Sequence, residues 1–372
     1  MCKKVLIAAT TAKGHINVFH VPYIKMFREK GWTVDVVTNG DEKVPFASNE
    51  YSISIKRSPF SVSNVFAIIQ MIRIMQKNRY DIVMCHTPMG GVVTRIAAYI
   101  TKTKPVIYMA HGFHFYKGAP FINAFLFKNI EKILASCTDG LITINKEDYK
   151  AAKKFKIRKN GKVYLIPGIG TDLYQIKNTN IDALSKRQEL GIPENAFVVL
   201  NVGELIDRKN QDSAIKAISR CKNKNIILVI CGRGVNDCKL KKLSKDLNIE
   251  ERIIFCGFRK DVYEIMKMAD VFLFPSFQEG LPVSVMEAMA SGLPIICSDI
   301  RGNRDLINNN GGYLVNPLDI EKMSYYIDFL YQNPNLRKLF GENNKKESEK
   351  YDLKKVILNM QSIIEEITGN CI

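Results

Sequence analysis

The sequence predicts an α/β protein built from two doubly wound parallel sheets. The chain has 372 residues, which is more than one hydrophobic core usually holds, so two domains are expected. Short apolar runs alternate with helix-length segments, and this alternation is typical of parallel strands joined by crossover helices. The alternation pauses in a polar stretch at 171–195 and then starts again, which indicates a second unit of the same kind.

The first half opens with an apolar run at 4–9, which we expect to be the first strand. A loop that contains Gly14 follows, and then a helix over about 19–30 that ends at Gly31, because glycine readily adopts the conformation that ends helices. The alternation continues to the end of this half. We expect strands at 33–38, 82–85, 105–110, 140–144 and 163–166, with helices near 62–78, 90–101, 121–136 and 146–154.

The second series begins with a strand at 196–202 and closes with a long helical region at about 319–369. Between them we expect strands at 226–231, 252–256, 271–274 and 294–298, separated by helices. The predicted domains are an N-terminal Rossmann-like domain at 1–170, a hinge region at 171–195, a C-terminal Rossmann-like domain at 196–350 and a final helix at 351–372.

The net charge is distributed unevenly along the chain. Residues 1–180 carry 27 Lys and Arg against 11 Asp and Glu, a net of +16, whereas residues 181–372 carry 27 against 26, a net of +1. A strongly basic half is typical of proteins that bind nucleic acid, an anionic membrane surface or an acidic substrate. No zinc-finger spacing, RNP string or convincing helix-turn-helix pattern supports a nucleic-acid partner.

Two predicted helices, near 62–79 and 121–135, combine bulky apolar residues with basic ones. Such helices can lie on a membrane surface; alternatively, their apolar stripes face the core. No apolar stretch reaches the roughly 20 residues that span a bilayer, and no signal peptide is evident. We therefore expect a cytoplasmic protein, peripherally associated with the inner face of the cell membrane. The basic residues on the two helices are Arg73, Lys77, Arg79, Lys128 and Lys132.

The nine Cys residues are scattered, with no C-x-x-C pair and no His residues at metal-ligand spacing. This pattern is typical of reduced, mostly buried cysteines in a cytoplasmic protein. We expect neither a metal site nor a cofactor.

Residues 277–294 form the most informative segment of the chain. The segment has helix length and separates two strand-like runs, so it predicts a loop followed by a crossover helix. Gly280 permits a tight loop, and Pro282 suits the first helical position, where a missing N–H costs nothing. The unpaired N–H groups and the positive dipole end of such a helix are suited to binding a phosphate.

Two carboxylates flank this predicted phosphate site. Glu279 lies on the loop, and Glu287 lies about one turn inside the helix. Each would repel a phosphate, so each needs neighbours that donate hydrogen bonds, and the ribose and sugar hydroxyls of a nucleotide sugar would do so. Alternatively, both are solvated and pair with nearby basic residues.

The string SFQEGLPVSVMEAMASGLPIICSD, which contains both carboxylates, resembles the signature of retaining GT-B glycosyltransferases. The strings AHGFHFYKGAP and LITINKEDY resemble, more narrowly, bacterial capsular and exopolysaccharide glycosyltransferases. The resemblance covers nearly the whole chain. It implies a GT-B fold, in which two Rossmann-like domains face each other across a cleft. The N-terminal domain would bind the acceptor, the C-terminal domain would bind the nucleotide sugar, and the final helix would cross back to the N-terminal domain.

The resemblance also implies roles for particular residues of the C-terminal domain. Glu287 would hold the ribose, and Glu279 would contact the donor sugar. Lys209, with Arg208 beside it, would neutralise the donor diphosphate, but Glu204 stands where the family commonly has Arg. The other residues expected at the donor are Gly203, Gly280, Leu281, Pro282 and Val283 near the phosphates, and Arg233, Phe258 and Arg259 near the base.

In the first half, His111 corresponds to a His that the family places against the donor sugar. Taken alone, such a His is more often a structural hydrogen-bonding residue. Gly14 would bring the backbone close to the phosphates or the acceptor. The candidate catalytic residues are therefore His111, Lys209 and Glu279, and no residue is expected to ligate a metal.

We expect an enzyme: a retaining, metal-independent hexosyl- or N-acetylhexosaminyl-transferase. It would move a sugar from a UDP-sugar to a lipid-linked saccharide acceptor in capsule or exopolysaccharide biosynthesis. The resemblance implies a same-face mechanism in which the leaving phosphate helps to deprotonate the acceptor, without an enzyme nucleophile. The alternatives are a nucleotide-sugar epimerase, a basic nucleic-acid-binding protein, and a catalytically silent nucleotide-sugar-binding partner, which Glu204 keeps open.

Overall fold

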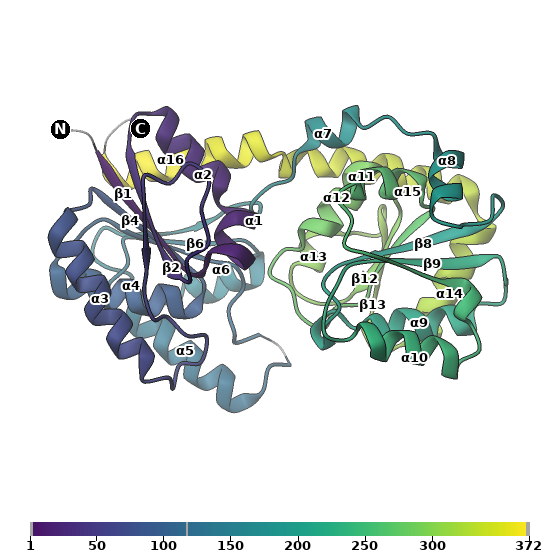
Figure 1. The fold of residues 1–372 in the computed structure, drawn as a ribbon, viewed down its shortest axis with the longest axis horizontal. Helices are drawn as coiled ribbons and strands as arrows, with labels where there is room; N and C mark the ends of the chain where they lie inside the picture. The colour runs from purple at the N-terminus through teal and green to yellow at the C-terminus, as the bar shows by residue number, and fades with distance from the viewer. Residues whose placement is uncertain (1–2, 117, 370–372) are drawn as a thin grey trace. The chain divides into compact units, whose positions relative to one another are not determined.

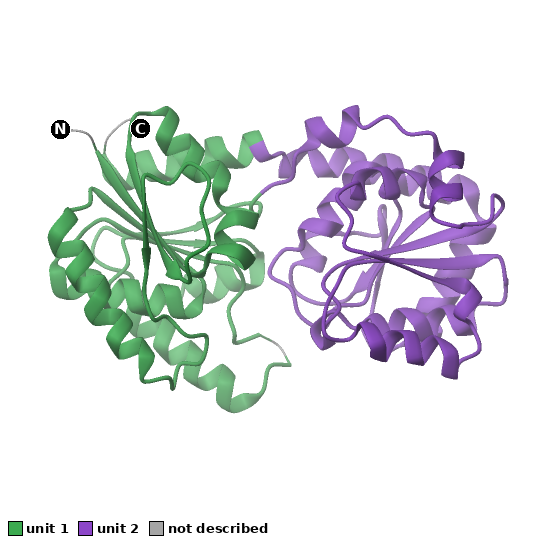
Figure 2. Cartoon of the chain, in the orientation of Figure 1, with its two compact units in different colours: residues 1–169, 354–372 green, residues 170–353 purple. Residues whose placement is uncertain are grey.

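The computed structural model describes residues 3–116 and 118–369, and the chain divides into two compact units. Unit 1 contains residues 1–169 and 354–372, and unit 2 contains residues 170–353 (Figure 2). Each unit has one parallel sheet with helices on both faces (Figure 1). The predicted α/β fold class, with two Rossmann-like units, is therefore confirmed.

The sheet of unit 1 has seven strands in the order β3-β2-β1-β4-β5-β6-β7, and all neighbours pair in parallel. The order reverses between β1 and β4, and ligands bind at the carboxyl ends of strands on either side of such a reversal. The central strands are buried on both faces, so they are nearly continuous apolar runs. The strands are β1 Lys4–Thr11, β2 Thr33–Asn39, β3 Asn49–Ser52, β4 Ile82–His86, β5 Val106–Ala110, β6 Gly140–Thr143 and β7 Lys162–Leu165.

Helices cover both faces of this sheet. α3, α4 and α5 lie together on one face, whereas α2 and α16 lie on the other (Figure 1). α16 packs closely on β6, because a Cβ on Gly140 would lie only 2.4 Å from Ile367 Cδ1. The helices are the π-helical turn η1 Ala12–Ile16, α1 Asn17–Phe19, α2 Val21–Glu29, α3 Ser63–Asn78, α4 Pro88–Thr101, α5 Phe121–Ala135, α6 Lys146–Ala152 and α16 Leu353–Thr368.

The sheet of unit 2 has six strands in the order β10-β9-β8-β11-β12-β13, again all parallel. Its order reverses between β8 and β11, which predicts a ligand site in the loops that follow these two strands. The strands are β8 Phe197–Val202, β9 Ile226–Cys231, β10 Ile253–Gly257, β11 Val271–Phe274, β12 Ile295–Ser298 and β13 Gly312–Val315.

The helices of unit 2 include two in the stretch 171–195, where the sequence suggested a hinge. Both of these helices, α7 and α8, group with unit 2. The helices are α7 Leu173–Asn178, α8 Ala183–Glu189, η2 Asp207–Lys209, α9 Gln211–Arg220, α10 Asp237–Asp246, η3 Glu250–Arg252, α11 Val262–Met268, α12 Val283–Ser291, α13 Asn303–Leu306, α14 Ile320–Gln332, α15 Pro334–Ser348 and η4 Glu349–Tyr351.

The final helix of the chain, α16, groups with unit 1 although it follows unit 2 in the sequence. The last part of the helix predicted at 351–372, residues 370–372, lies outside the described residues. Over the part of the chain that the structure describes, no helix combines the length and apolarity required to cross a membrane.

Candidate functional site

The loops after β8 and β11 in unit 2 bring three of the predicted donor-site residues together. Glu279 lies on the loop before α12, and its Oε1 accepts hydrogen bonds from Lys209 Nζ at 2.8 Å and Arg208 Nη1 at 2.9 Å. The same oxygen accepts a third hydrogen bond, 2.6 Å long, from Ser276 Oγ. The Glu279 side chain is only 9% exposed, so the two cations neutralise a nearly buried carboxylate.

The Lys209 side chain is held in one place by its surroundings. Its ammonium lies 4.8 Å from the centroid of the Phe274 ring, and only 14% of the side chain is exposed. A Cβ on Gly203 would lie 3.6 Å from Lys209 Cδ, so the glycine lies directly beside the lysine stem. Lys209 is therefore a fixed positive charge at the carboxyl edge of the sheet. Glu204, by contrast, has an exposed side chain.

α12 begins beside this charge cluster. The helix begins at Val283, one residue later than predicted, so Pro282 is its N-cap, and no side chain among the described residues caps its first turn. The loop before it is fixed by Arg301, whose Nε donates to the carbonyl oxygen of Glu279 at 3.1 Å. Gly302 crosses the same loop so closely that a Cβ there would lie 2.4 Å from the Gly280 oxygen. The N–H groups and dipole of α12 thus have a fixed direction, as a phosphate site requires.

Glu287 lies one turn inside α12 in a mostly apolar environment. Its Oε1 accepts a hydrogen bond from the Tyr263 hydroxyl at 3.1 Å. Burial raises the pKa of the Glu287 carboxyl to about 7, because this one hydrogen bond compensates little of the lost hydration. A ligand that donates hydroxyl hydrogen bonds to this carboxylate would therefore be bound well, as the predicted ribose contact requires.

A cavity of about 500 Å³ lies at the carboxyl ends of β9 and β10. Arg233 lines it, and Phe258, which is 64% exposed, does not; a base-binding role for either residue stays a prediction. Arg259 is tied into ion pairs with Asp261 and Glu189, so its guanidinium is already engaged. Stacking of Arg259 on a base therefore stays a prediction. The remaining residues that line the cavity are Gly234, Asp237, Lys241, Phe255, Cys256 and Gly257.

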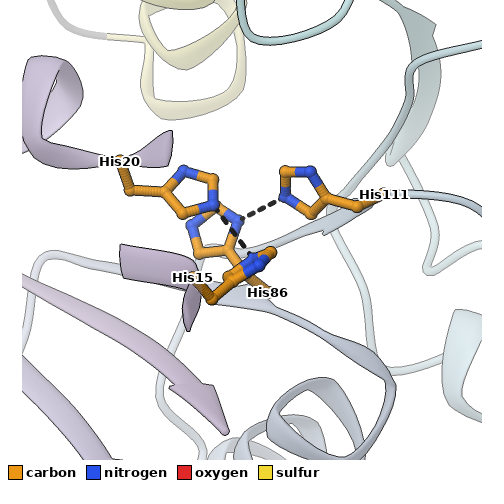
Figure 3. Close-up of side chains that lie close together, drawn as sticks. All are labelled: His15, His20, His86 and His111. Carbon is orange, nitrogen blue, oxygen red and sulfur yellow. Dashed lines mark hydrogen bonds between the residues drawn. The ribbon is translucent and has the colours of Figure 1, made fainter. Parts of the chain in front are cut away.

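Unit 1 holds a second group of functional side chains, four histidines at the carboxyl ends of neighbouring strands (Figure 3). His15 and His20 belong to the segment after β1, His86 ends β4, and His111 follows β5. Gly14, the other predicted residue of unit 1, lies next to His15 in η1. Each histidine offers one ring nitrogen, and these four atoms all lie within 4.8 Å of one another.

No spacing in the sequence predicts this cluster, because the usual metal motifs rely on short spacings within one segment. His111 was a candidate only through the family resemblance, as a contact of the donor sugar. Here three separate segments supply the imidazoles, and only the strand order β1-β4-β5 makes them neighbours. The useful signal was positional, since His86 and His111 both stand where a buried strand ends.

The chain belongs to the group 1 glycosyltransferases. Residues 182–347 match the family model "Glycosyl transferases group 1", and residues 4–145 match "Glycosyl transferase 4-like". A relative from Bacillus subtilis (strain 168), named "Putative glycosyltransferase EpsD", is 37% identical over 98% of this chain and 96% of its own length. An Escherichia coli relative is 32% identical over 70% of this chain and 68% of its own length; it is named UDP-Gal:alpha-D-GlcNAc-diphosphoundecaprenol alpha-1,3-galactosyltransferase.

Solved structures agree with this assignment at the level of the fold. The structure of Anabaena Alr3699/HepE in complex with UDP aligns with a TM-score of 0.79 at 19% identity, over 98% of this chain and 100% of that one. WaaG, a glycosyltransferase involved in lipopolysaccharide biosynthesis, aligns with a TM-score of 0.78 at 17% identity, over 97% and 99% of the two chains. The GT-B fold predicted from the sequence is confirmed.

Proposed function

We propose that this glycosyltransferase is a retaining enzyme that moves a sugar from a UDP-sugar to a lipid-linked saccharide. The main support for a nucleotide-sugar donor is the group of Lys209, Arg208 and Glu279, which lies beside the first turn of α12, where no side chain caps the helix. The name of the Escherichia coli relative contains both a UDP-sugar and a polyprenyl diphosphate, and the Anabaena structure contains UDP. Both support a UDP-sugar donor here, and the first supports a lipid-linked acceptor.

The proposed chemistry depends on neutralising the leaving diphosphate. Lys209, Arg208 and the first-turn N–H groups of α12 would stabilise the negative charge that develops as the glycosidic bond breaks. The acceptor oxygen attacks the face from which the diphosphate leaves, and a diphosphate oxygen takes the acceptor proton. Glu279 accepts three hydrogen bonds. A carboxylate held in this way is better suited to positioning the donor sugar than to acting as a nucleophile. Glu287 holds the ribose.

Unit 1 exposes large apolar side chains that suit contact with the membrane in which a lipid-linked acceptor would lie. On α3 and the loop before it, Phe60 is 80% exposed and Phe66 is 60% exposed. On α5, Phe121 is 82% exposed and Phe125 is 64% exposed. Only part of each helix therefore packs on the core. Exposed Arg73 and Lys77 lie on α3, and exposed Lys128 and Lys132 lie on α5.

Aromatic side chains that are surrounded by cations bind the boundary of an anionic leaflet. α3 and α5 both neighbour α4 on the same face of the sheet, so their exposed residues form one side of unit 1. We therefore propose that this side contacts the inner face of the cell membrane, where a lipid-linked acceptor would be found. A role in capsule or exopolysaccharide synthesis would follow, and the similarity to EpsD supports it.

The direct test is UDP release by the purified protein from a panel of UDP-sugars, with and without a lipid extract of bacterial membranes. We expect one UDP-sugar to release UDP, and only when lipid is present. The product should keep the anomeric configuration of the donor, which proton NMR of the new linkage would show. Absence of release from every UDP-sugar, together with no detectable UDP binding in calorimetry, would contradict the proposal.

A further inference from the structure

The four-histidine cluster of unit 1 is built by the fold of that unit. β1, β4 and β5 are adjacent in the sheet, and their carboxyl ends reach the same edge. His86 is the last residue of β4, and His111 comes directly after β5. His15 and His20 come from the short helical turns that follow β1. Figure 3 shows the four rings turned toward one another.

The spacing of the ring nitrogens is that of ligands around one small ion. His20 Nε2 lies 3.1 Å from His15 Nε2, and His111 Nε2 lies 3.5 Å from His86 Nδ1. Tetrahedral Zn²⁺ with Zn–N bonds of about 2.0–2.1 Å places its ligand nitrogens about 3.3 Å apart. All four ligand atoms lie within 4.8 Å of one another.

The cluster also leaves buried polar atoms without a partner. His20 is 0% exposed and His86 is 1% exposed, and their rings are stacked with centroids 3.7 Å apart. Neither His20 Nδ1 nor His86 Nε2 has a hydrogen-bond partner among the described residues. These two atoms are the other nitrogens of the rings, not His20 Nε2 and His86 Nδ1, so an ion bound by the close pairs would leave them facing away from it.

Burial favours the neutral form of these imidazoles, which suits a cation better than an anion. Burial lowers the pKa of all four imidazoles, that of His15 to about 4, and the neighbouring rings lower those of His20, His86 and His111 further. The four side chains are therefore neutral at pH 7 and do not attract a phosphate by charge. Neutral imidazoles offer lone pairs, and a cation binds to them without having to displace a proton.

We propose that His15, His20, His86 and His111 bind one divalent late transition metal ion, Zn²⁺ in the first instance. Imidazole nitrogen suits Zn²⁺ and its neighbours in the first transition series, whereas Mg²⁺ and Ca²⁺ prefer oxygen. Four protein ligands fill a tetrahedral site, which is the arrangement of structural zinc and leaves no position for substrate. The ion ties the segment after β1 to the ends of β4 and β5. His111 then acts as a ligand, in place of the donor-sugar contact that the resemblance implied.

The experiment uses the full chain without a histidine tag, stripped with a chelator and dialysed. Co²⁺ is titrated in while the visible absorbance is recorded, because tetrahedral Co²⁺ absorbs far more strongly than octahedral Co²⁺. Zn²⁺ is then added to displace it, and the melting temperature is measured with and without Zn²⁺. We expect one equivalent of tetrahedral Co²⁺ per chain and a higher melting temperature with Zn²⁺. Neither donor nor acceptor is present, so the result is independent of glycosyl transfer.

The chain supplies its own control, because it has five histidines and only one is outside the cluster. His114 is exposed and packs its ring on Phe127, so His114→Ala should bind Co²⁺ like the wild type. His111→Asn and His15→Asn should weaken binding by roughly 100-fold or more, since each removes a ligand. Circular dichroism of the metal-free variants shows whether they fold. Absence of saturable binding by the wild type, or equal binding by a folded His111→Asn variant, overturns the proposal.

Discussion

Replacing Glu287 by Gln should stabilise unit 2, although Glu287 belongs to the proposed donor site. Burial raises the pKa of this carboxyl from 4.5 to about 7, so the folded chain binds the proton more tightly than the unfolded chain does. At about 1.4 kcal/mol per pH unit, the charged form costs roughly 3 kcal/mol of folding free energy above pH 7. This cost falls as the pH drops from about 7 to 4.5 and is absent below that, where the carboxyl is protonated in both states.

Gln has nearly the same shape and never becomes charged. Glu287→Gln should therefore match the wild type at pH 4.5 and exceed its stability by about 3 kcal/mol at pH 8, a rise in melting temperature of roughly 6–12 °C. Scanning calorimetry across this pH range measures the difference. The only tryptophan, Trp32, lies in unit 1, so a transition without a change in its fluorescence reports on unit 2.

Glu279→Gln is the matched control, because it changes the other carboxylate in the same way. Glu279 neutralises Lys209 and Arg208, so its loss should destabilise unit 2 at pH 8 instead of stabilising it. If Glu287→Gln is no more stable than the wild type at pH 8, or is more stable by the same amount at every pH, then desolvation does not explain the raised pKa of Glu287.

Three further predictions concern single side chains of the two units. Lys209→Ala should lower turnover by about 10²–10³-fold with the fold intact. Loss of all activity in EDTA that Mg²⁺ or Mn²⁺ restores would contradict the expectation that transfer needs no metal. Glu131 pairs with the fully buried Arg95 at 2.9 Å, so Glu131→Ala should destabilise unit 1 by about 3–5 kcal/mol in urea denaturation, and a loss below 1 kcal/mol would refute the importance of that pair. The protein should sediment with phosphatidylglycerol liposomes and not with neutral ones; Phe121→Asp should weaken this without changing UDP affinity, and equal binding to both liposomes would remove the case for the proposed membrane contact.

The order of strands and helices was predictable from sequence because buried parallel strands are apolar runs separated by helix-length segments. Two edge strands, β3 and β13, were not predicted. The residues of β3, Asn49–Ser52, are mostly polar and exposed at the edge of the sheet. Its ladder with β2 and side-chain hydrogen bonds, such as that from Asn49 Nδ2 to Asp35 Oδ1 at 2.7 Å, hold it in extended form. A strand of this kind has no signal in hydrophobic periodicity.

In the candidate sites, too, residues within local motifs were predictable, and contacts that depend on the order of strands in the sheet were not. Glu279, Glu287 and Lys209 could be selected as candidates from the sequence because each lies in a local motif. The pairing of Lys209 with Glu279 across 70 positions of sequence was not predictable, because it depends on β8 lying next to β11. The histidine cluster depends in the same way on the neighbouring positions of β1, β4 and β5.

The placement of α16 has a consequence for attempts to separate the two units. The chain passes from one unit to the other twice, near residue 170 and near residue 353, and the two passages are hydrogen-bonded where Leu353 N donates to Thr171 O at 3.0 Å. A single cut therefore yields no intact unit 1. A fragment ending at residue 169 would expose the surface of β6 on which Ile367 packs, and a fragment starting at 170 would carry an unpartnered amphipathic helix whose apolar side chains favour aggregation. Excision of unit 1 requires joining α16 to β7 through a new linker.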